Sequence, residues 1–120
     1  MKKRVLIIDD DPRNIFALAA TLRAKAYIID SCDSATDALN LLKTDAVFDV
    51  ILIDMMMPEM DGYDTIPLIR EIPSRLATPI VAVTAQAMTG DRKKCLAAGA
   101  DDYLSKPVNV DHLFKLLQTF

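Results

Sequence analysis

Short runs of apolar residues recur along the chain and are separated by longer stretches with helical character. The runs at 5–8, 50–53 and 80–83 contain no polar residue, and such continuous apolarity is typical of parallel strands that are covered on both faces. Two further strands are predicted at 27–31 and 102–105. Strands that alternate with helices in this way favour an α/β fold with an open, doubly wound parallel sheet and right-handed crossovers.

The helical stretches are recognised by their apolar spacing and by residues suited to helix ends. Five helices are predicted. The first two lie at 12–25 and 35–43, and the third runs from just after Asp61-Gly62 to near Pro73. The fourth ends at Gly99, and the fifth lies at 109–118. Ser34 and Thr89 are suitable N-terminal caps for the second and fourth of these helices, and Gly99 suits a left-handed helix end. A chain of 120 residues is of ordinary size for one domain, so we expect residues 1–120 to form a single domain.

Charge, apolar run length and cysteine content exclude several classes of function. The net charge is −3 and the basic runs at 2–4 and 92–94 are short, so direct binding to nucleic acid is not expected. No apolar run approaches the length of a membrane span or of a signal-peptide core, so membrane insertion is not expected either. Cys32 and Cys95 are not spaced like metal ligands in the sequence. We expect them to serve as small apolar side chains in a protein of the reducing cytoplasm.

Polar residues with complementary chemistry stand at the carboxyl ends of the predicted strands. They are Asp9, Asp10, Asp54, Thr84 and Lys106. The carboxyl ends of parallel strands share one edge of the sheet, and ligands bind there in doubly wound folds. Three carboxylates repel one another unless cations compensate them. A lysine and Mg²⁺ would do so, because oxygen ligands without histidine or thiolate favour this ion.

A solitary acid at the end of a strand is more often a helix cap or a surface charge than part of a site. Here the strand ends carry an Asp pair, an Asp, a Thr and a Lys, whereas the strands themselves are apolar. Residues selected only for stability would not gather in this way. We therefore interpret this edge of the sheet as a functional site.

Four segments of the chain resemble the receiver domains of response regulators. They are residues 8–14 (IDDDPRN), 54–62 (DMMMPEMDG), 84–85 (TA) and 106–107 (KP). The resemblance extends over essentially the whole chain, and the order and spacing of the segments together are specific to that family. It implies a flavodoxin-like fold, with five parallel strands in the order 2-1-3-4-5 and five helices.

The resemblance also implies a role for each matching residue. Asp54 is then the phosphoacceptor, Asp10 a direct Mg²⁺ ligand, and Asp9 a ligand or an acid that acts through bound water. The backbone carbonyl of Met56 would complete the protein ligands of the ion. Asp54 would itself bind the metal.

Three further positions match the family's catalytic and switch residues. Thr84 and Lys106 would each contact a phosphoryl oxygen, the first through its hydroxyl and the second through its ammonium. Thr84 would also couple phosphorylation to Tyr103, which falls on the family's aromatic switch position. The peptide bond between Lys106 and Pro107 is expected to be cis.

The function implied by the resemblance is that of a signal carrier. A carboxylate takes a phosphoryl group from a phosphohistidine of a histidine kinase or a histidine phosphotransfer protein and forms an acyl phosphate. The chain would assist its own phosphorylation and slow dephosphorylation without being an enzyme, and it would switch a face that a downstream protein reads. Whether phosphorylation causes the chain to form a dimer stays an open question. So does the choice between a stand-alone cytoplasmic regulator, slightly favoured by the start Met1-Lys2-Lys3-Arg4, and the receiver of a hybrid kinase.

The same residues argue against several other functions. A phosphatase of the haloacid-dehalogenase type places a second Asp two residues after its nucleophile, where this chain has Met56. A mononucleotide-binding fold needs a glycine-rich loop after the first strand, and the chain has none there. A degenerate receiver that only docks partners would not need the full set of acids, Thr84 and Lys106. His112, the only histidine, is expected on the surface rather than as a phosphoryl carrier.

Overall fold

The computed structural model describes residues 3–85 and 91–120, and its centre is a sheet of parallel strands. The strands are β1 (Arg4–Ile8), β2 (Ile28–Cys32), β3 (Val50–Asp54), β4 (Ile80–Thr84) and β5 (Asp102–Ser105). Their order in the sheet is β2-β1-β3-β4-β5. This order and the flavodoxin-like fold confirm the expectation from the sequence.

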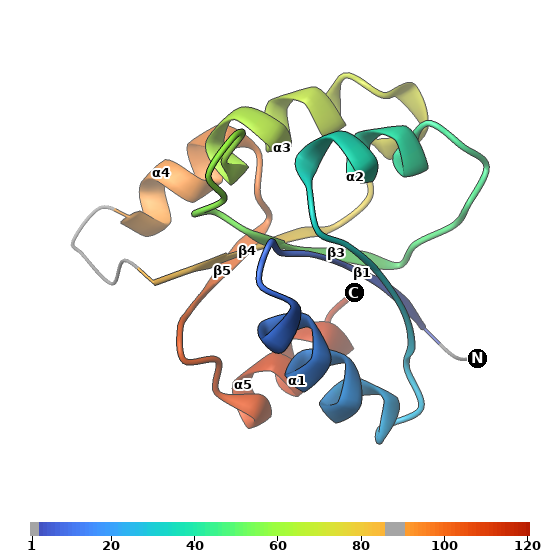
Figure 1. The fold of residues 1–120 in the computed structure, drawn as a ribbon, viewed down its shortest axis with the longest axis vertical. Coiled ribbons are helices and arrows are strands. Elements are labelled where there is room, and N and C mark those ends of the chain that lie inside the picture. Colours follow the sequence, from blue (N-terminus) through green and yellow to red (C-terminus); the bar gives the residue numbers. More distant parts are fainter. Residues whose placement is uncertain (1–2, 86–90) are drawn as a thin grey trace.

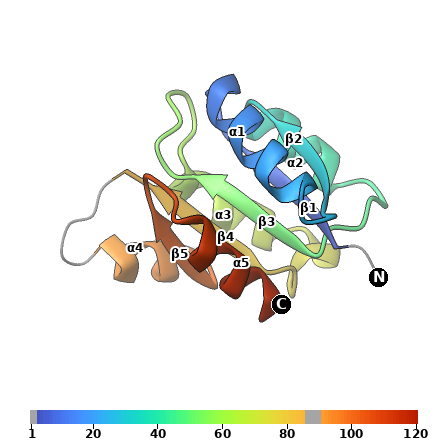
Figure 2. The same ribbon diagram turned by 90° about the horizontal axis from the view of Figure 1, so that it is seen from below.

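Helices cover both faces of the sheet. They are α1 (Pro12–Arg23), α2 (Ala35–Leu42), α3 (Gly62–Arg70), α4 (Asp91–Ala98) and α5 (Val110–Gln118), with a 3₁₀ turn η1 (Pro73–Arg75). Figure 1 shows α2, α3 and α4 on one face and α1 and α5 on the other, and Figure 2, seen from below, shows α1 and α5 in front of the sheet. The arrangement is a three-layer α/β/α sandwich.

Each face of the sheet has its own apolar core. Alternate residues of β1 point to opposite faces, so that Leu6 and Ile8 pack beneath α2 and α3 whereas Val5 and Ile7 pack against α1 and α5. All residues of β3 and β4 are buried. The continuous apolar runs that predicted these strands are therefore explained by burial on both faces.

The helix ends follow local rules in most places. The Ser34 hydroxyl accepts the backbone N–H of Asp37 at 3.2 Å, and Gly99 follows α4 with a φ of +117°, as both residues predicted. The cap predicted at Thr89 lies outside the described residues.

The first and third helices end earlier than predicted. Helix α1 ends at Arg23, and Ala26 then takes a φ of 69°. This is a left-handed conformation, which is usually indicated in a sequence by glycine, and there is no glycine here. Helix α3 ends at Arg70 because Pro73 holds Ile72 in an extended conformation, with a ψ of 116°. The 3₁₀ turn η1 follows directly.

The beginning of the described chain is tied to its end. The ammonium of Lys3 donates to the carbonyl oxygens of Leu117 and Phe120, at 2.9 and 2.8 Å. Leu117 lies in the last turn of α5, and its carbonyl also accepts the backbone N–H of Phe120 at 3.3 Å. No helix in the described part of the chain has the length and apolar character needed to cross a membrane.

Candidate functional site

The strand ends bring the predicted polar residues to one edge of the sheet. Asp9 and Asp10 follow β1, Asp54 ends β3 and Lys106 follows β5. One carboxylate oxygen from each of the three acids lies within 4.8 Å of the others. The predicted convergence of these side chains is therefore present in the structure.

Lys106 supplies a cation to this acidic cluster. Its Nζ lies 3.4 Å from Asp54 Oδ1 and 3.7 Å from Asp9 Oδ2. Both acids are buried, at 5% and 3% exposure, whereas Asp10 is exposed. The ammonium thus offsets part of the charge of two desolvated carboxylates.

Backbone amides also hold the two buried carboxylates. Asp9 Oδ1 accepts the N–H of Asp11 at 2.9 Å, and Asp54 Oδ1 accepts the N–H of Met56 at 3.0 Å. Each carboxylate is therefore fixed by the chain that follows its strand. Sequence patterns carry no signal for such main-chain donors, and these contacts were not predicted.

Burial of Asp9 opposes the ionisation of its carboxyl group. Removal from water raises the pKa of Asp9 above its ordinary value, and the neighbouring Asp54 carboxylate raises it further. The N–H of Asp11 and the charge of Lys106 act in the opposite direction. The site thus concentrates negative charge that a further cation would stabilise.

The donor set fits a hard divalent cation. The three acids offer only carboxylate oxygens, which are the ligands that Mg²⁺ prefers. Asp10 is exposed beside two buried acids, so the cluster is open on one side. An open side suits an ion that retains waters and exchanges one for a phosphate oxygen.

Thr84 and Tyr103 lie on the adjacent strands β4 and β5, with Thr84 at the carboxyl end of β4 and Tyr103 two register positions before that end. Thr84 ends β4 and is fully buried, and its carbonyl accepts the N–H of Lys106 at 2.7 Å. Tyr103 pairs with Ala82 in the β4–β5 register and is half-buried against the core beneath α3 and α4. The peptide bond between Lys106 and Pro107 is cis, as predicted.

The loop after Asp54 is packed from below. Met55 and Met57 are buried under the site and Met56 is 48% exposed. Gly62 has no room for a side chain, because a Cβ there would lie 2.9 Å from the Met55 Cα and would overlap the Met55 sulfur. The loop conformation therefore requires glycine at this position.

His112 is exposed in the first turn of α5, as expected from the sequence, and Lys93 and Lys94 are exposed on α4. Cys95 is buried and Cys32 is half-buried. None of these residues joins the acidic cluster.

Asp11 was not singled out in the sequence, although it shapes the site. It is the N-cap of α1, and its side chain accepts the N–H of Arg13 at 2.9 Å. An acid directly before a proline is the usual pattern for such a cap, so a signal was present. The cap fixes the turn that presents Asp9 and Asp10.

Comparison with known proteins identifies relatives along the whole chain. The family model for the response regulator receiver domain matches residues 5–118. The signal transduction histidine-protein kinase BarA of Escherichia coli is 41% identical over 113 residues, which cover 94% of this chain and 12% of BarA. The chain therefore corresponds to a small part of that relative.

Solved structures give the same result. The receiver domain of sensor histidine kinase PA1611 from Pseudomonas aeruginosa, solved with a magnesium ion in the active site cleft, is 34% identical, with a TM-score of 0.89 and coverage of 99% of this chain and 97% of that one. The receiver domain of Ssk1, solved with the histidine phosphotransfer protein Ypd1 of Saccharomyces cerevisiae, is 28% identical, with a TM-score of 0.88 and coverage of 98% and 87%. These relatives do not favour the phosphatase or the docking module as alternatives.

Proposed function

The chain belongs to the response regulator receiver domain family of two-component signalling, and from this membership we propose that it carries its signal as a phosphoryl group on Asp54. The observation that carries the proposal is the position of this carboxylate. It is buried at the end of a central strand, 3.4 Å from the Lys106 ammonium and within 4.8 Å of oxygens of Asp9 and Asp10.

The proposed chemistry is a transfer between two side chains. An oxygen of Asp54 attacks the phosphorus of a phosphohistidine, the P–N bond breaks, and the imidazole leaves with its electron pair and takes up a proton. An acyl phosphate results. Lys106 neutralises phosphoryl charge through its ammonium, and the Thr84 hydroxyl donates to another phosphoryl oxygen. Catalysis of this kind rests on positioning and charge neutralisation.

The proposed metal is Mg²⁺, held by Asp9, Asp10 and Asp54 with the carbonyl of Met56. When bound, the ion neutralises charge on the acids and on the phosphoryl oxygens. Support comes from the all-oxygen cluster and from the PA1611 receiver, whose structure contains magnesium in its cleft. Asp10→Ala should weaken Mg²⁺ binding severely in a titration followed by NMR shifts. Unchanged affinity would remove Asp10 from the metal site.

We further propose that the chain stores the phosphoryl group rather than turning over a substrate. Met56, two residues after Asp54, is a thioether that can neither donate nor accept a proton in hydrolysis. Phosphatases of the haloacid-dehalogenase type carry an acid at that position, and this chain does not. The chain would assist its own phosphorylation, and the acyl phosphate would be lost slowly.

The proposed phosphodonor is a histidine kinase or a histidine phosphotransfer protein, as in the complex of Ypd1 with the Ssk1 receiver. Exposed apolar side chains near the carboxyl edge suit such a partner: Phe16 on α1, Met56 after β3 and Val110 on α5 are 76%, 48% and 41% exposed. They add apolar contact area on the elements that follow β1, β3 and β5. The free cysteines suit the cytoplasm, where we place this exchange.

Intact mass after treatment with a small phosphodonor and Mg²⁺ tests the proposal. The wild type should gain one phosphoryl group, EDTA should prevent the gain, and Asp54→Asn should show none. Asp45→Asn, an exposed acid between α2 and β3, is the matched control and should behave as the wild type. Phosphorylation of Asp54→Asn at another residue would contradict the assignment. A wild type that binds a phosphotransfer protein but takes up no phosphoryl group would be a docking module.

A further inference from the structure

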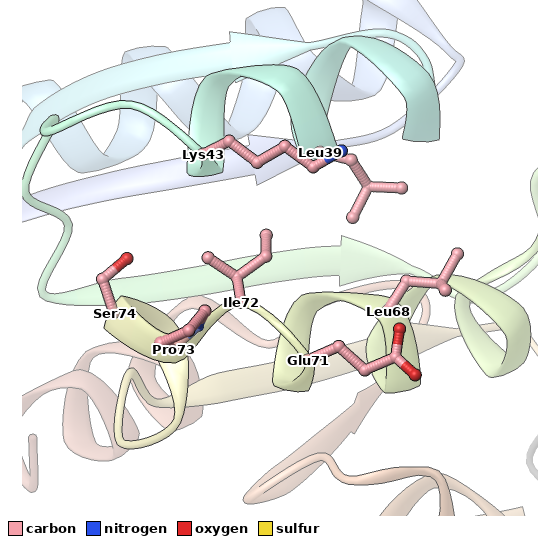
Figure 3. A pocket seen from close by; sticks show the side chains of 7 residues that line it. All are labelled: Leu39, Lys43, Leu68, Glu71, Ile72, Pro73 and Ser74. Atoms are coloured by element: carbon pink, nitrogen blue, oxygen red, sulfur yellow. The ribbon is translucent and has the colours of Figure 1, made fainter.

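A second concave surface lies between α2 and α3, away from the acidic cluster. It encloses about 560 Å³. Leu39 and Lys43 line it from α2 and its C-cap, and Leu68, Glu71 and Ile72 line it from α3 and the segment that follows (Figure 3). We call this surface the α2–α3 groove.

The groove lies toward the edge of the sheet opposite Asp54. Its residues come from the C-terminal halves of α2 and α3. Crossover helices run antiparallel to the strands that they connect, so their C-terminal ends lie toward the amino ends of the strands. Asp54 stands at the carboxyl end of β3. A molecule bound in the groove would therefore leave the phosphoacceptor accessible.

Buried Arg75 holds the two rims of the groove at a fixed separation. It belongs to η1, which continues the α3 rim, and it is 5% exposed. Its guanidinium donates to the carbonyl oxygens of Leu42 and Thr44, at 3.0 and 3.3 Å, and to that of Ala46. These carbonyls end α2 and begin the loop after it. The groove is thus preformed, and preformed surfaces lose less entropy when they bind.

The groove and the segments beside it expose apolar side chains. Leu68 on the α3 rim is 37% exposed. Val47, in the loop that Arg75 ties to η1, and Leu76, directly after η1, are 70% and 66% exposed. Exposed apolar residues that gather around a concave surface are typical of interaction sites.

The rims carry opposite charges that are not used within the described chain. Lys43 extends along its rim toward Leu39, and Glu71 lies on the opposite rim (Figure 3). Among residues 3–85 and 91–120, neither side chain has an ion-pair partner within 4.0 Å. A partner for this groove should therefore present an acid to the α2 rim and a base to the α3 rim.

We propose that the partner is a second copy of this chain, bound groove to groove about a two-fold axis that runs along the groove. A half turn about that axis exchanges the rims, so that α2 of each copy faces α3 of the other. Lys43 then pairs with Glu71 of the partner subunit, and the reciprocal pair forms by symmetry. Leu39, Leu68 and Ile72 of both copies meet between the two pairs.

This dimer is small and forms at high protein concentration. The seven residues that line the groove are fewer than the roughly 20–30 a side of a standard interface, and exposed ion pairs contribute little each. It does not rest on phosphorylation of Asp54, because the surface and the phosphoacceptor lie at opposite edges of the sheet.

Sedimentation equilibrium of the full chain, from micromolar to millimolar concentration, tests the proposal through charge reversal. The wild type should show a concentration-dependent dimer. Lys43→Glu and Glu71→Lys should each weaken it by about tenfold or more, because both symmetric pairs change from attraction to repulsion. The double variant Lys43→Glu/Glu71→Lys should restore the wild-type constant. Rising salt should weaken the wild-type dimer.

The control is Lys93→Glu, which makes the same charge change on the exposed face of α4, outside the groove. It should leave the dimer unchanged. Equal weakening by Lys93→Glu, a double variant that does not recover, or a monomer throughout the range would overturn the proposal. A monomeric wild type whose Leu68→Asp variant loses phosphotransfer from a histidine phosphotransfer protein would assign the groove to that partner instead. Intact mass after phosphodonor treatment should be the same in all of the charge variants.

Discussion

The hydroxyl of Tyr63 donates to Asp91 Oδ1 over 2.7 Å and joins the first turn of α3 to the first turn of α4. Asp91 is 4% exposed, and its second oxygen accepts no hydrogen bond in the described part of the chain. Tyr63 is thus the side-chain donor that holds a buried carboxylate. The contact fixes the beginning of α4, the helix that follows Thr84 in the chain.

Tyr63→Phe should therefore destabilise the fold. Loss of the hydroxyl leaves the Asp91 carboxylate buried without its donor, and we expect the free energy of unfolding to fall by about 1–3 kcal/mol. Urea unfolding followed by circular dichroism measures the change. In Asp91→Asn the same substitution of Tyr63 should cost clearly less, because a neutral amide needs the donor less. Equal costs in both backgrounds would show that the bond contributes nothing specific.

The same contact predicts a loss of stability at high pH. Burial, and then the hydrogen bond to Asp91, raise the pKa of Tyr63 well above its ordinary value of 10.0. A raised pKa in the folded state gives stability that is fully present below the unfolded value and is lost as the pH rises toward the folded value. The absorbance of ionised tyrosine should show a titration step at high pH, well above 10, and this step should be absent from Tyr63→Phe. A wild-type titration in which all tyrosines ionise together near pH 10 would contradict it.

Asp9→Asn should stabilise the metal-free protein at neutral pH. Burial raises the folded pKa of Asp9 above the ordinary 3.8, so the stability linked to its protonated form is present below that value and is lost as the pH rises through the folded pKa. Asparagine removes the buried charge and keeps an oxygen for the Asp11 N–H. We expect a gain of about 0.5–2 kcal/mol, measured in EDTA, that disappears below about pH 3.8. A less stable variant at neutral pH would show that pairing with Lys106 outweighs burial.

Arg75→Met should destabilise the chain more than most single substitutions. The side chain is buried, and its removal leaves the carbonyls of Leu42, Thr44 and Ala46 without their donor. We expect a loss of about 2–4 kcal/mol in urea unfolding. Arg92→Met, on the exposed surface of α4, should change stability by less than about 0.5 kcal/mol. Similar losses in both variants would mean that Arg75 does not hold α2 and η1 together.

Thr84→Ala should separate phosphorylation from its readout. We expect Thr84 to move toward the phosphoryl group and Tyr103, on the adjacent strand, to turn inward, because the phosphoryl group offers the Thr84 hydroxyl a charged acceptor. Beryllofluoride, a phosphoryl mimic, should shift NMR resonances along α4, β5 and α5 in the wild type. The variant should still take up the phosphoryl group but lose these shifts. A wild-type Tyr103 that keeps one rotamer on activation would exclude this switch.

The edge that holds the site was predictable because two simple regularities act together. Strands buried on both faces are apolar throughout, as β3 and β4 are, so their ends could be located in the sequence. Parallel strands then bring those ends to one edge, which places Asp9, Asp54 and Lys106 together without knowledge of any distance.

Contacts between distant surface segments were not predictable in the same way. Arg75 and Tyr63 look like ordinary polar residues in the sequence, and their partners lie roughly 30 positions away. No periodicity links such pairs, since they depend on how the helices pack. The early end of α1 belongs to the same class, because Ala26 adopts its φ of 69° without a local glycine signal.

The tie between Lys3 and the end of α5 has a practical consequence for experiments on this protein. It brings the two ends of the described chain together beside the C-terminal end of α5, at the side of the sheet that Asp54 does not occupy. A fluorophore, an affinity handle or a surface tether at either end is therefore carried away from the incoming phosphodonor. For the same reason the ends can be joined by a short peptide, and new ends can be opened elsewhere, without crossing the acidic edge. A label attached to the new ends of a circularly permuted chain could therefore report on phosphorylation without contacting the site.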